Sequence, residues 1–238
     1  MEPTSIKSYL EELSTTADRI LLLQGPIGTF FSDFADWLHQ QCGKTVFKLN
    51  FNAGDELCFP ATKPNTFAYT DTFQAFPDFL SAFIREHRIE AVVCFGDTRP
   101  YHIAAKSVVH VLGNVSFWAF EEGYFRPYFV TLEKSGVNAY SPLPRDARFF
   151  ADAYPHLSRQ SYQDPAPVPA GFLPVAKQAI RYYVAARLHQ RRYPHYIHHR
   201  INHIGHYVKL WTLSGLKRVN YVLEDRHFAR QVKSGKYG

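Results

Sequence analysis

The stretch VSFWAFEEGYFRP (Val115–Pro127) joins a mostly apolar run of strand length to a group of charged residues. Glu121 and Glu122 are therefore expected where a buried strand leaves the core, and adjacent carboxylates are costly to bury unpaired. Gly123 permits a sharp turn there, and Arg126 supplies a compensating positive charge. Open α/β sheets bind their ligands at such strand ends, although a surface turn with an incidental ion pair would have the same composition.

Strands and helices alternate on the N-terminal side of this stretch. Apolar runs of strand length cover Arg19–Gln24, Thr45–Leu49, Glu90–Phe95 and Val115–Phe120. Apolar residues with helical spacing lie between them, over Phe30–Gln41, Phe76–His87 and Ile103–Leu112. This alternation predicts a parallel, Rossmann-like sheet with helices on both of its faces, and Tyr128–Leu132 is a candidate for a further strand.

The chain is expected to divide into three parts. The α/β domain is predicted over residues 1–157, a proline-rich linker over 158–174, and a mostly helical, basic segment over 175–238. The sequence contains no G-x-G-x-x-G fingerprint, no P-loop and no G-x-S-x-G element, which argues against the dinucleotide-binding, P-loop and serine-hydrolase classes.

Composition favours a globular protein with anionic partners. Of the 238 residues, 46% are hydrophobic and 20% are charged, and the formal net charge is +6. Such a surface suits nucleotides, nucleic acid, sugar acids or acidic lipid, but none of the common nucleic-acid-binding signatures appears. The three cysteines have no metal-type spacing and are expected to be reduced. No signal peptide and no run of transmembrane length is apparent, so we expect a cytoplasmic protein.

Polar clusters follow four of the predicted strands. They are Gln24–Gly25, then Asn52, Gly54 and Asp55, then Gly96, Asp97, Arg99 and His102, and finally Glu121, Glu122 and Arg126. Because parallel strands end at one edge of a sheet, these clusters are expected to converge. In the third cluster, Asp97 is suited to act as a base or to orient a sugar hydroxyl, and its two cationic neighbours are suited to bind a carboxylate or phosphate. The alternative is that Asp97 or Thr98 only caps the next helix, with Arg99 in solvent.

A histidine-rich segment lies near the C-terminus. On a helix, its members would share roughly one face: His195, His198, His199, His203 and His206. A metal site is disfavoured because no acidic ligand is nearby and the surroundings are cationic. The remaining interpretations are an anion-binding surface that includes Arg200, or a solvated or inter-domain helix.

Several motifs together resemble the capsule polysaccharide biosynthesis/export family, and within it the branch of KpsS-like bacterial β-Kdo (3-deoxy-D-manno-oct-2-ulosonic acid) glycosyltransferases. The motifs are LLLQGPIGTFF (21–31), NFNAGDE (50–56), FGDTRPYHIAA (95–105), FEEGYFRPYFVTLE (120–133), GVN (136–138), LPRD (143–146) and YPHYIHHR (193–200). The resemblance runs over most of the chain.

The resemblance implies a retaining transferase with the N-terminal lobe of a GT-B fold. Its donor would be CMP-Kdo, its acceptor a phosphatidylglycerol-type lipid or a Kdo linker, and its location the inner-membrane surface of a Gram-negative bacterium, alongside other capsule assembly proteins. No cofactor, no metal and no nucleic acid are expected. Members of the group continue into a second Rossmann-like half that is expected to bind the nucleotide sugar, so the activity of this short chain alone is not implied.

Residues and resemblance together lead to a set of candidate site residues. The predicted catalytic residues are Glu122 or Glu121 at the reaction centre, followed by Asp97. The predicted substrate-binding residues are Gln24, Gly25, Asp55, Arg99, His102, Gly123, Tyr124, Arg126, His198, His199 and Arg200. Two other classes of function remain open. One is a non-catalytic module of the export machinery that docks lipid or a partner through the basic 181–217 face, and the weaker one is a nucleic-acid binder using the same face.

Overall fold

The computed structural model describes residues 8–123, 128–157, 172–198 and 204–233. By internal contacts the chain divides into two units, residues 1–197 and 198–238. The helices of the first unit are α1 (Tyr9–Thr16), α2 (Phe30–Cys42), α3 (Ala53–Cys58), α4 (Phe76–Glu86), α5 (Pro100–Leu112), α6 (Ala147–Leu157) and α7 (Phe172–Leu188). Its strands are β1 (Arg19–Leu22), β2 (Thr45–Asn50), β3 (Thr66–Ala68), β4 (Ala91–Phe95), β5 (Ser116–Glu122) and β6 (Val130–Lys134). Short 3-10 turns are η1 (Phe73–Ala75), η2 (Asn138–Tyr140) and η3 (Gln190–Arg192).

The strands form one six-stranded sheet in the order β3-β2-β1-β4-β5-β6. The first five are parallel, and β6 pairs with β5 in the antiparallel direction. The predicted Rossmann-like α/β class is therefore confirmed, together with the four strands that the apolar runs indicated. The candidate strand at residues 128–132 exists over Val130–Lys134, and its direction follows from the connection after β5, whose seven residues are too few for a crossover helix.

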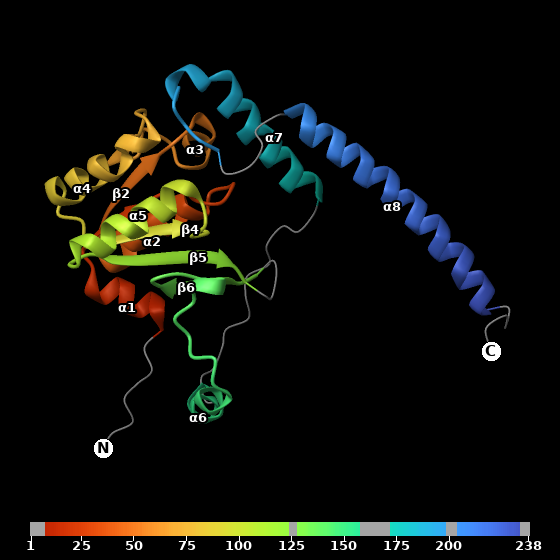
Figure 1. The fold of residues 1–238 in the computed structure, drawn as a ribbon, viewed down its shortest axis with the longest axis horizontal. Helices are drawn as coiled ribbons and strands as arrows, with labels where there is room; N and C mark the ends of the chain where they lie inside the picture. The colour runs from red at the N-terminus through yellow and green to blue at the C-terminus, as the bar shows by residue number, and fades with distance from the viewer. Residues whose placement is uncertain (1–7, 124–127, 158–171, 199–203, 234–238) are drawn as a thin grey trace. The chain divides into compact units, whose positions relative to one another are not determined.

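Helices cover both faces of the sheet, as Figure 1 shows. On one face α4 and α5 pack over alternate strand residues such as Leu21, Val92 and Phe117. On the other face α1 and α2 pack over the residues between them, such as Ile20 and Val93. Central parallel strands buried on both faces have nearly continuous apolar sequences, which is why their positions were predictable.

Glycine directly follows two of the long helices. The residue after α2 is Gly43, with φ 67°, and the residue after α5 is Gly113, with φ 72°. Both adopt the left-handed conformation that closes a helix C-terminus. Four of the helices and strands within residues 1–157 were not predicted, namely α1, α3, α6 and β3. Of these, α1, α3 and β3 are short and lack a full period of apolar residues.

The helical segment that follows residue 171 is divided between the two units. Helix α7 belongs to the first unit and packs against α3, so it lies at the carboxyl edge of the sheet. Helix α8 (Ile204–Lys233) belongs to the second unit and carries apolar side chains on all sides, with little amphipathic character. Most of the expected linker, residues 158–171, lies outside the described residues.

Candidate functional site at the carboxyl edge of the sheet

The turn after β4 is built around Gly96, whose φ of 71° favours glycine. Its N–H donates to the carbonyl oxygen of Phe120 at 2.8 Å, which ties the turn to β5. The Nδ1 of His102 hydrogen-bonds the Gly96 carbonyl oxygen, and because a carbonyl only accepts, Nδ1 carries the proton. The His102 side chain is fully buried, so this predicted ligand residue supports the turn from inside the fold.

Helix α5 begins directly after this turn. Its N-cap residue is Arg99, Pro100 follows, and no side chain caps the first turn. The alternative interpretation, in which Asp97 or Thr98 caps the helix, is therefore wrong. The carboxylate of Asp97 accepts the N–H of Val137 at 3.1 Å instead. Asp97 therefore binds the segment that contains Val137, and the Arg99 side chain points to other strand ends.

Three strand exits meet at Gly96. The Nη1 of Arg99 donates to the carbonyl oxygen of Gly25, after β1, at 3.1 Å. A Cβ placed on Gly96 would lie 3.8 Å from Oε2 of Glu121 and 4.0 Å from Nε of Arg99. The loops after β1, β4 and β5 therefore bring a backbone carbonyl, a guanidinium and a carboxylate together around one glycine.

The two adjacent glutamates are not equivalent. Glu121 is half-buried, and it accepts a hydrogen bond from Asn138 Nδ2 at 3.3 Å and from its neighbour's backbone N–H at 2.9 Å. Glu122 is exposed and lies on the opposite face of β5, because side chains alternate along a strand. Of the predicted pair, Glu121 is the carboxylate that lies beside Gly96 and Arg99.

Asp97 is 3% exposed and lies at the other side of the same turn. A Cβ on Gly136 would meet Oδ2 of Asp97 and Nζ of Lys106, each at 2.9 Å. Gly136 also has a φ of 144°, which other residues rarely adopt. The GVN segment at 136–138 is thus explained: its glycine fits between an acid and a base, and Val137 and Asn138 donate to the two candidate carboxylates.

A second polar cluster forms at the ends of β1 and β2. Asp55 accepts hydrogen bonds from Gln24 Nε2 at 3.0 Å, from Tyr182 Oη at 2.9 Å and from the Phe51 N–H at 2.9 Å. Tyr196 Oη accepts from Gln24 Nε2 at 2.9 Å. Both predicted substrate-binding residues here, Gln24 and Asp55, are nearly inaccessible beneath these tyrosines. Burial raises the pKa of Tyr182 and Tyr196, so both remain protonated donors at neutral pH.

The tyrosines of this cluster were not predicted from the sequence. Tyr182 lies 127 residues and Tyr196 172 residues from their main partners, Asp55 and Gln24. The one local signal is Gly54, where a Cβ would meet the Tyr182 ring at 2.7 Å. A glycine in the first turn of a short helix can indicate that another element packs there closely.

Gly25 has a packing reason of the same kind. A Cβ on it would meet the Phe31 ring at 2.9 Å, so glycine is required by the fold at this position. Gly123 is also enclosed, because it is buried and its N–H donates to the Phe129 carbonyl oxygen at 3.0 Å.

Tyr124, Arg126, His199 and Arg200 lie outside the described residues. His198 is described and half-buried, and it is the first residue of the second unit.

Two features are absent from the described residues. No group of three or more His, Cys, Asp or Glu side chains among them is arranged to hold a metal ion. No helix in the described ranges is both long and apolar enough to cross a lipid bilayer. The edge of the sheet itself offers carboxylates, a guanidinium and backbone groups, which are suited to proton transfer and to anion binding.

Comparison with known proteins identifies the family. A family model described as capsule polysaccharide biosynthesis protein matches residues 90–238, which includes the turn after β4 and both glutamates of β5. The chain belongs to this capsule polysaccharide biosynthesis family. The resemblance drawn from the sequence motifs is confirmed at this level.

Two named relatives extend the comparison. The chain is 55% identical over its full length to the capsule polysaccharide modification protein LipB of Neisseria meningitidis serogroup B, covering 56% of that protein. It is 35% identical over 212 residues to the capsule polysaccharide export protein KpsS of Escherichia coli, which is 87% of this chain and 51% of that protein. This member of the capsule family thus spans about half the length of the curated relatives it matches. No solved structure matches it significantly.

Proposed function

We propose that this chain forms the acceptor-side part of a glycosyltransferase that moves β-Kdo from CMP-Kdo to a phosphatidylglycerol-type lipid or a Kdo linker. The observation that carries the proposal is the meeting of Glu121, Arg99 and Asp97 around the Gly96 turn at the carboxyl edge of a parallel sheet. Open α/β sheets bind substrates at this edge. Membership of a capsule polysaccharide biosynthesis family and similarity to LipB and KpsS support the same conclusion.

The proposed reaction assigns a role to each of these groups. The bond between the anomeric carbon of Kdo and the phosphate oxygen of CMP breaks, and a bond to the acceptor hydroxyl oxygen forms. The carboxylate of Glu121 takes the hydroxyl proton, and CMP departs with the bonding electrons. The acceptor oxygen bonds to the anomeric carbon on the face that the phosphate leaves, so the configuration of the donor is retained. Arg99 binds the departing phosphate or the Kdo carboxylate, because a guanidinium matches both in geometry and charge. Asp97, held by Val137, stabilises positive charge that develops on the sugar.

The proposed setting is the cytoplasmic side of the inner membrane, with the protein bound at the surface. A formal charge of +6 supports attraction both to an anionic donor and to acidic lipid. We propose no metal or organic cofactor, since CMP-Kdo itself supplies the activated sugar.

The test is donor binding followed by transfer. Calorimetric titration of an enzyme that has the full length of the relatives and carries the same residues, with CMP and then CMP-Kdo, is expected to show saturable binding that Arg99→Gln weakens about tenfold, which corresponds to the loss of one charge-assisted hydrogen bond. The transfer assay uses the same enzyme. In it, Glu121→Gln is expected to abolish turnover while the protein remains folded. Retained turnover would refute the role of Glu121, and Glu86→Gln, an exposed glutamate on α4, is the matched control.

A second candidate function is a non-catalytic module that docks lipid or a partner protein. The outward side of α7 favours it, because Leu173, Ile180 and Leu188 are exposed there and basic residues lie between them. Donor dependence separates the two functions. An enzyme must recognise CMP-Kdo, whereas a docking module binds vesicles or protein without it.

A further inference from the structure

Two carboxylates and two cations surround the end of β4 without pairing. The side chains are those of Asp97, Glu121, Arg99 and Lys106. All four lie near the buried thiol of Cys94: burial raises the pKa of this thiol, the two carboxylates raise it further, and the two cations oppose the rise. Within the part of the chain that the structure describes, none of the four forms an ion pair at 4.0 Å or less. Opposite charges this near attract each other, so the fold must hold them apart.

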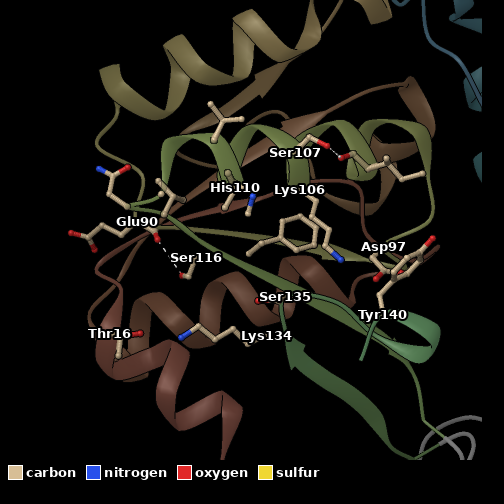
Figure 2. Close-up of a pocket in the computed structure, with 17 residues that line it drawn as sticks. Thr16, Glu90, Asp97, Lys106, Ser107, His110, Ser116, Lys134, Ser135 and Tyr140 are labelled. Atoms are coloured by element: carbon tan, nitrogen blue, oxygen red, sulfur yellow. Dashed lines mark hydrogen bonds between the residues drawn. The ribbon is translucent and has the colours of Figure 1, made fainter. Parts of the chain in front are cut away.

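On one side of the Gly96 turn, an acid and a base have neutral partners. The Asp97 carboxylate accepts the Val137 N–H at 3.1 Å. The Lys106 ammonium lies 4.8 Å from the centre of the Tyr140 ring, which is a cation–π contact. Figure 2 shows Asp97, Lys106 and Tyr140 toward one end of a groove that runs along α5. The segment that follows β6 thus supplies a neutral partner to each of these two charges.

On the other side of the turn, Glu121 and Arg99 are near enough to pair. A Cβ on Gly96 would lie 3.8 Å from Oε2 of Glu121 and 4.0 Å from Nε of Arg99. Rotation about one side-chain torsion would bring two such atoms together. Arg99 uses Nη1 for the Gly25 carbonyl oxygen, which leaves Nε for another acceptor. The Glu121 carboxylate accepts its neighbour's backbone N–H at 2.9 Å and Nδ2 of Asn138 at 3.3 Å instead.

The backbone explains how the Asn138 amide reaches this position. Asn138 has a φ of 55° and Ser135 a φ of 70°, which are two of the four positive φ values at non-glycine residues in the described chain. Strain is therefore concentrated in this segment, as it often is at functional sites, and asparagine tolerates the conformation better than most residues. Val137 is 1% exposed and anchors the segment in the core. Asn138 itself is exposed, so the packing of the core does not require its side chain.

We propose that Asn138 is a positioning residue whose side-chain amide holds Glu121 away from Arg99. An ion pair between these two residues would occupy the carboxylate and the guanidinium together. The amide donates to the carboxylate without neutralising its charge, so both groups remain available. The inference rests on the proposed function in one respect, the use of Glu121 as the base and of Arg99 as the anion-binding group. The separation of the two charges does not depend on which substrate binds.

The test is Asn138→Gly, because glycine adopts a positive φ without strain and removes only the amide side chain. Nuclear magnetic resonance of the chain labelled with ¹⁵N-arginine follows the Nε–Hε signal of Arg99, which is assigned by its loss in Arg99→Lys. In Asn138→Gly, this signal is expected to move downfield and its exchange with solvent to slow about tenfold, which corresponds to one charge-assisted hydrogen bond from Glu121 pairing. Both changes are expected to disappear when Glu121→Gln is added, because glutamine carries no charge.

Asn65→Gly is the matched control. Asn65 is also exposed, has a φ of 53°, and donates from Nδ2 to the Val46 carbonyl oxygen at 3.4 Å. It is expected to leave the Arg99 signal unchanged. The positioning role would be overturned by an unchanged Arg99 signal in Asn138→Gly, by an equal change in Asn65→Gly, or by a change that persists when Glu121→Gln is added.

Transfer assays separate this inference from the proposed reaction. In an enzyme that has the full length of the relatives and carries the same residues, Asn138→Gly is expected to lower kcat/KM for CMP-Kdo about tenfold, because the ion pair must break before either group can act. Full transfer activity despite an observed pair between Arg99 and Glu121 would refute the proposed reaction and leave the positioning role in place.

Discussion

Tyr182 provides the sharpest test of how α7 is held on the sheet. Its hydroxyl donates to Asp55 Oδ1 at 2.9 Å and accepts from Gln24 Nε2 at 3.1 Å and from Asn52 Nδ2 at 2.9 Å. Because burial raises its pKa well above the ordinary value, the hydroxyl remains protonated at pH 7. Tyr182→Phe removes the oxygen alone and keeps the ring that packs on Gly54.

The expected cost follows from those three contacts. A buried hydrogen bond to a carboxylate contributes about 2 kcal/mol and a neutral one about 1 kcal/mol. In the Tyr182→Phe protein, Gln24 Nε2 keeps its contacts with Asp55 at 3.0 Å and Tyr196 at 2.9 Å. Losing the contact with the Tyr182 hydroxyl therefore costs less free energy at Gln24 than at Asn52. We therefore expect Tyr182→Phe to reduce the free energy of unfolding by about 3 kcal/mol.

Urea denaturation followed by circular dichroism measures this change, and hydrogen exchange locates it. Amides of α3 and α7 are expected to lose protection before those of β1 and β4. Tyr154→Phe is the matched control, since Tyr154 is 70% exposed and its loss is expected to stay within about 0.5 kcal/mol. A Tyr182→Phe protein within 1 kcal/mol of native stability, or equal to the control, would refute the assigned role of the hydroxyl.

Two further predictions concern packing and pH. Gly54→Ala is expected to destabilise the chain by about 2 kcal/mol because its Cβ would meet the Tyr182 ring. The control is Gly215→Ala in α8, where nothing lies within 4 Å, and it is expected to be neutral or stabilising by up to about 1 kcal/mol. Comparable urea midpoints for the two variants would contradict this prediction. Burial lowers the pKa of Lys48 from 10.5 to about 8, so between these values the unfolded chain binds more protons and native stability rises with pH. Relative to Lys48→Met, the native chain is expected to gain roughly 2–3 kcal/mol from pH 7 to pH 10, and parallel stability curves would rule that out.

The sheet and its helices were predictable because their signals are local. Buried parallel strands such as Ile20–Leu22 and Ala91–Phe95 are continuous apolar runs, and Gly43 and Gly113 end helices by a conformation that depends on one residue. The convergence of strand exits was predictable for the same reason, since parallel connectivity alone places them at one edge. No direction was predicted for β6, although the short connection between the predicted strands at 115–120 and 128–132 already excludes a parallel crossover.

The site itself was only partly predictable. Adjacent glutamates in a sequence are equal candidates, and their separation into a half-buried Glu121 and an exposed Glu122 depends on which face of β5 each occupies. His102 and Asp97 are residue types that often bind ligands, but in the structure both side chains are buried and each hydrogen-bonds a backbone group. The backbone groups that they bind belong to Gly96 and Val137, and no sequence pattern at these residues predicts the contacts.

By itself the sequence determined the alternation of strands and helices, the Rossmann-like class and the capsule-family motifs, because apolar periodicity and turn residues act over a few neighbours. Tertiary structure alone decided that Tyr182 and Tyr196 close over Gln24 and Asp55, that Arg99 and Glu121 meet at Gly96, and that a groove opens beside Lys106. Arg99 and Glu121, which share Gly96 as a neighbour, are 22 positions apart in the sequence, and Gln24 and Tyr196 are 172 positions apart. Hydrogen bonding and close packing depend on position in space, and no local pattern along the chain encodes that position.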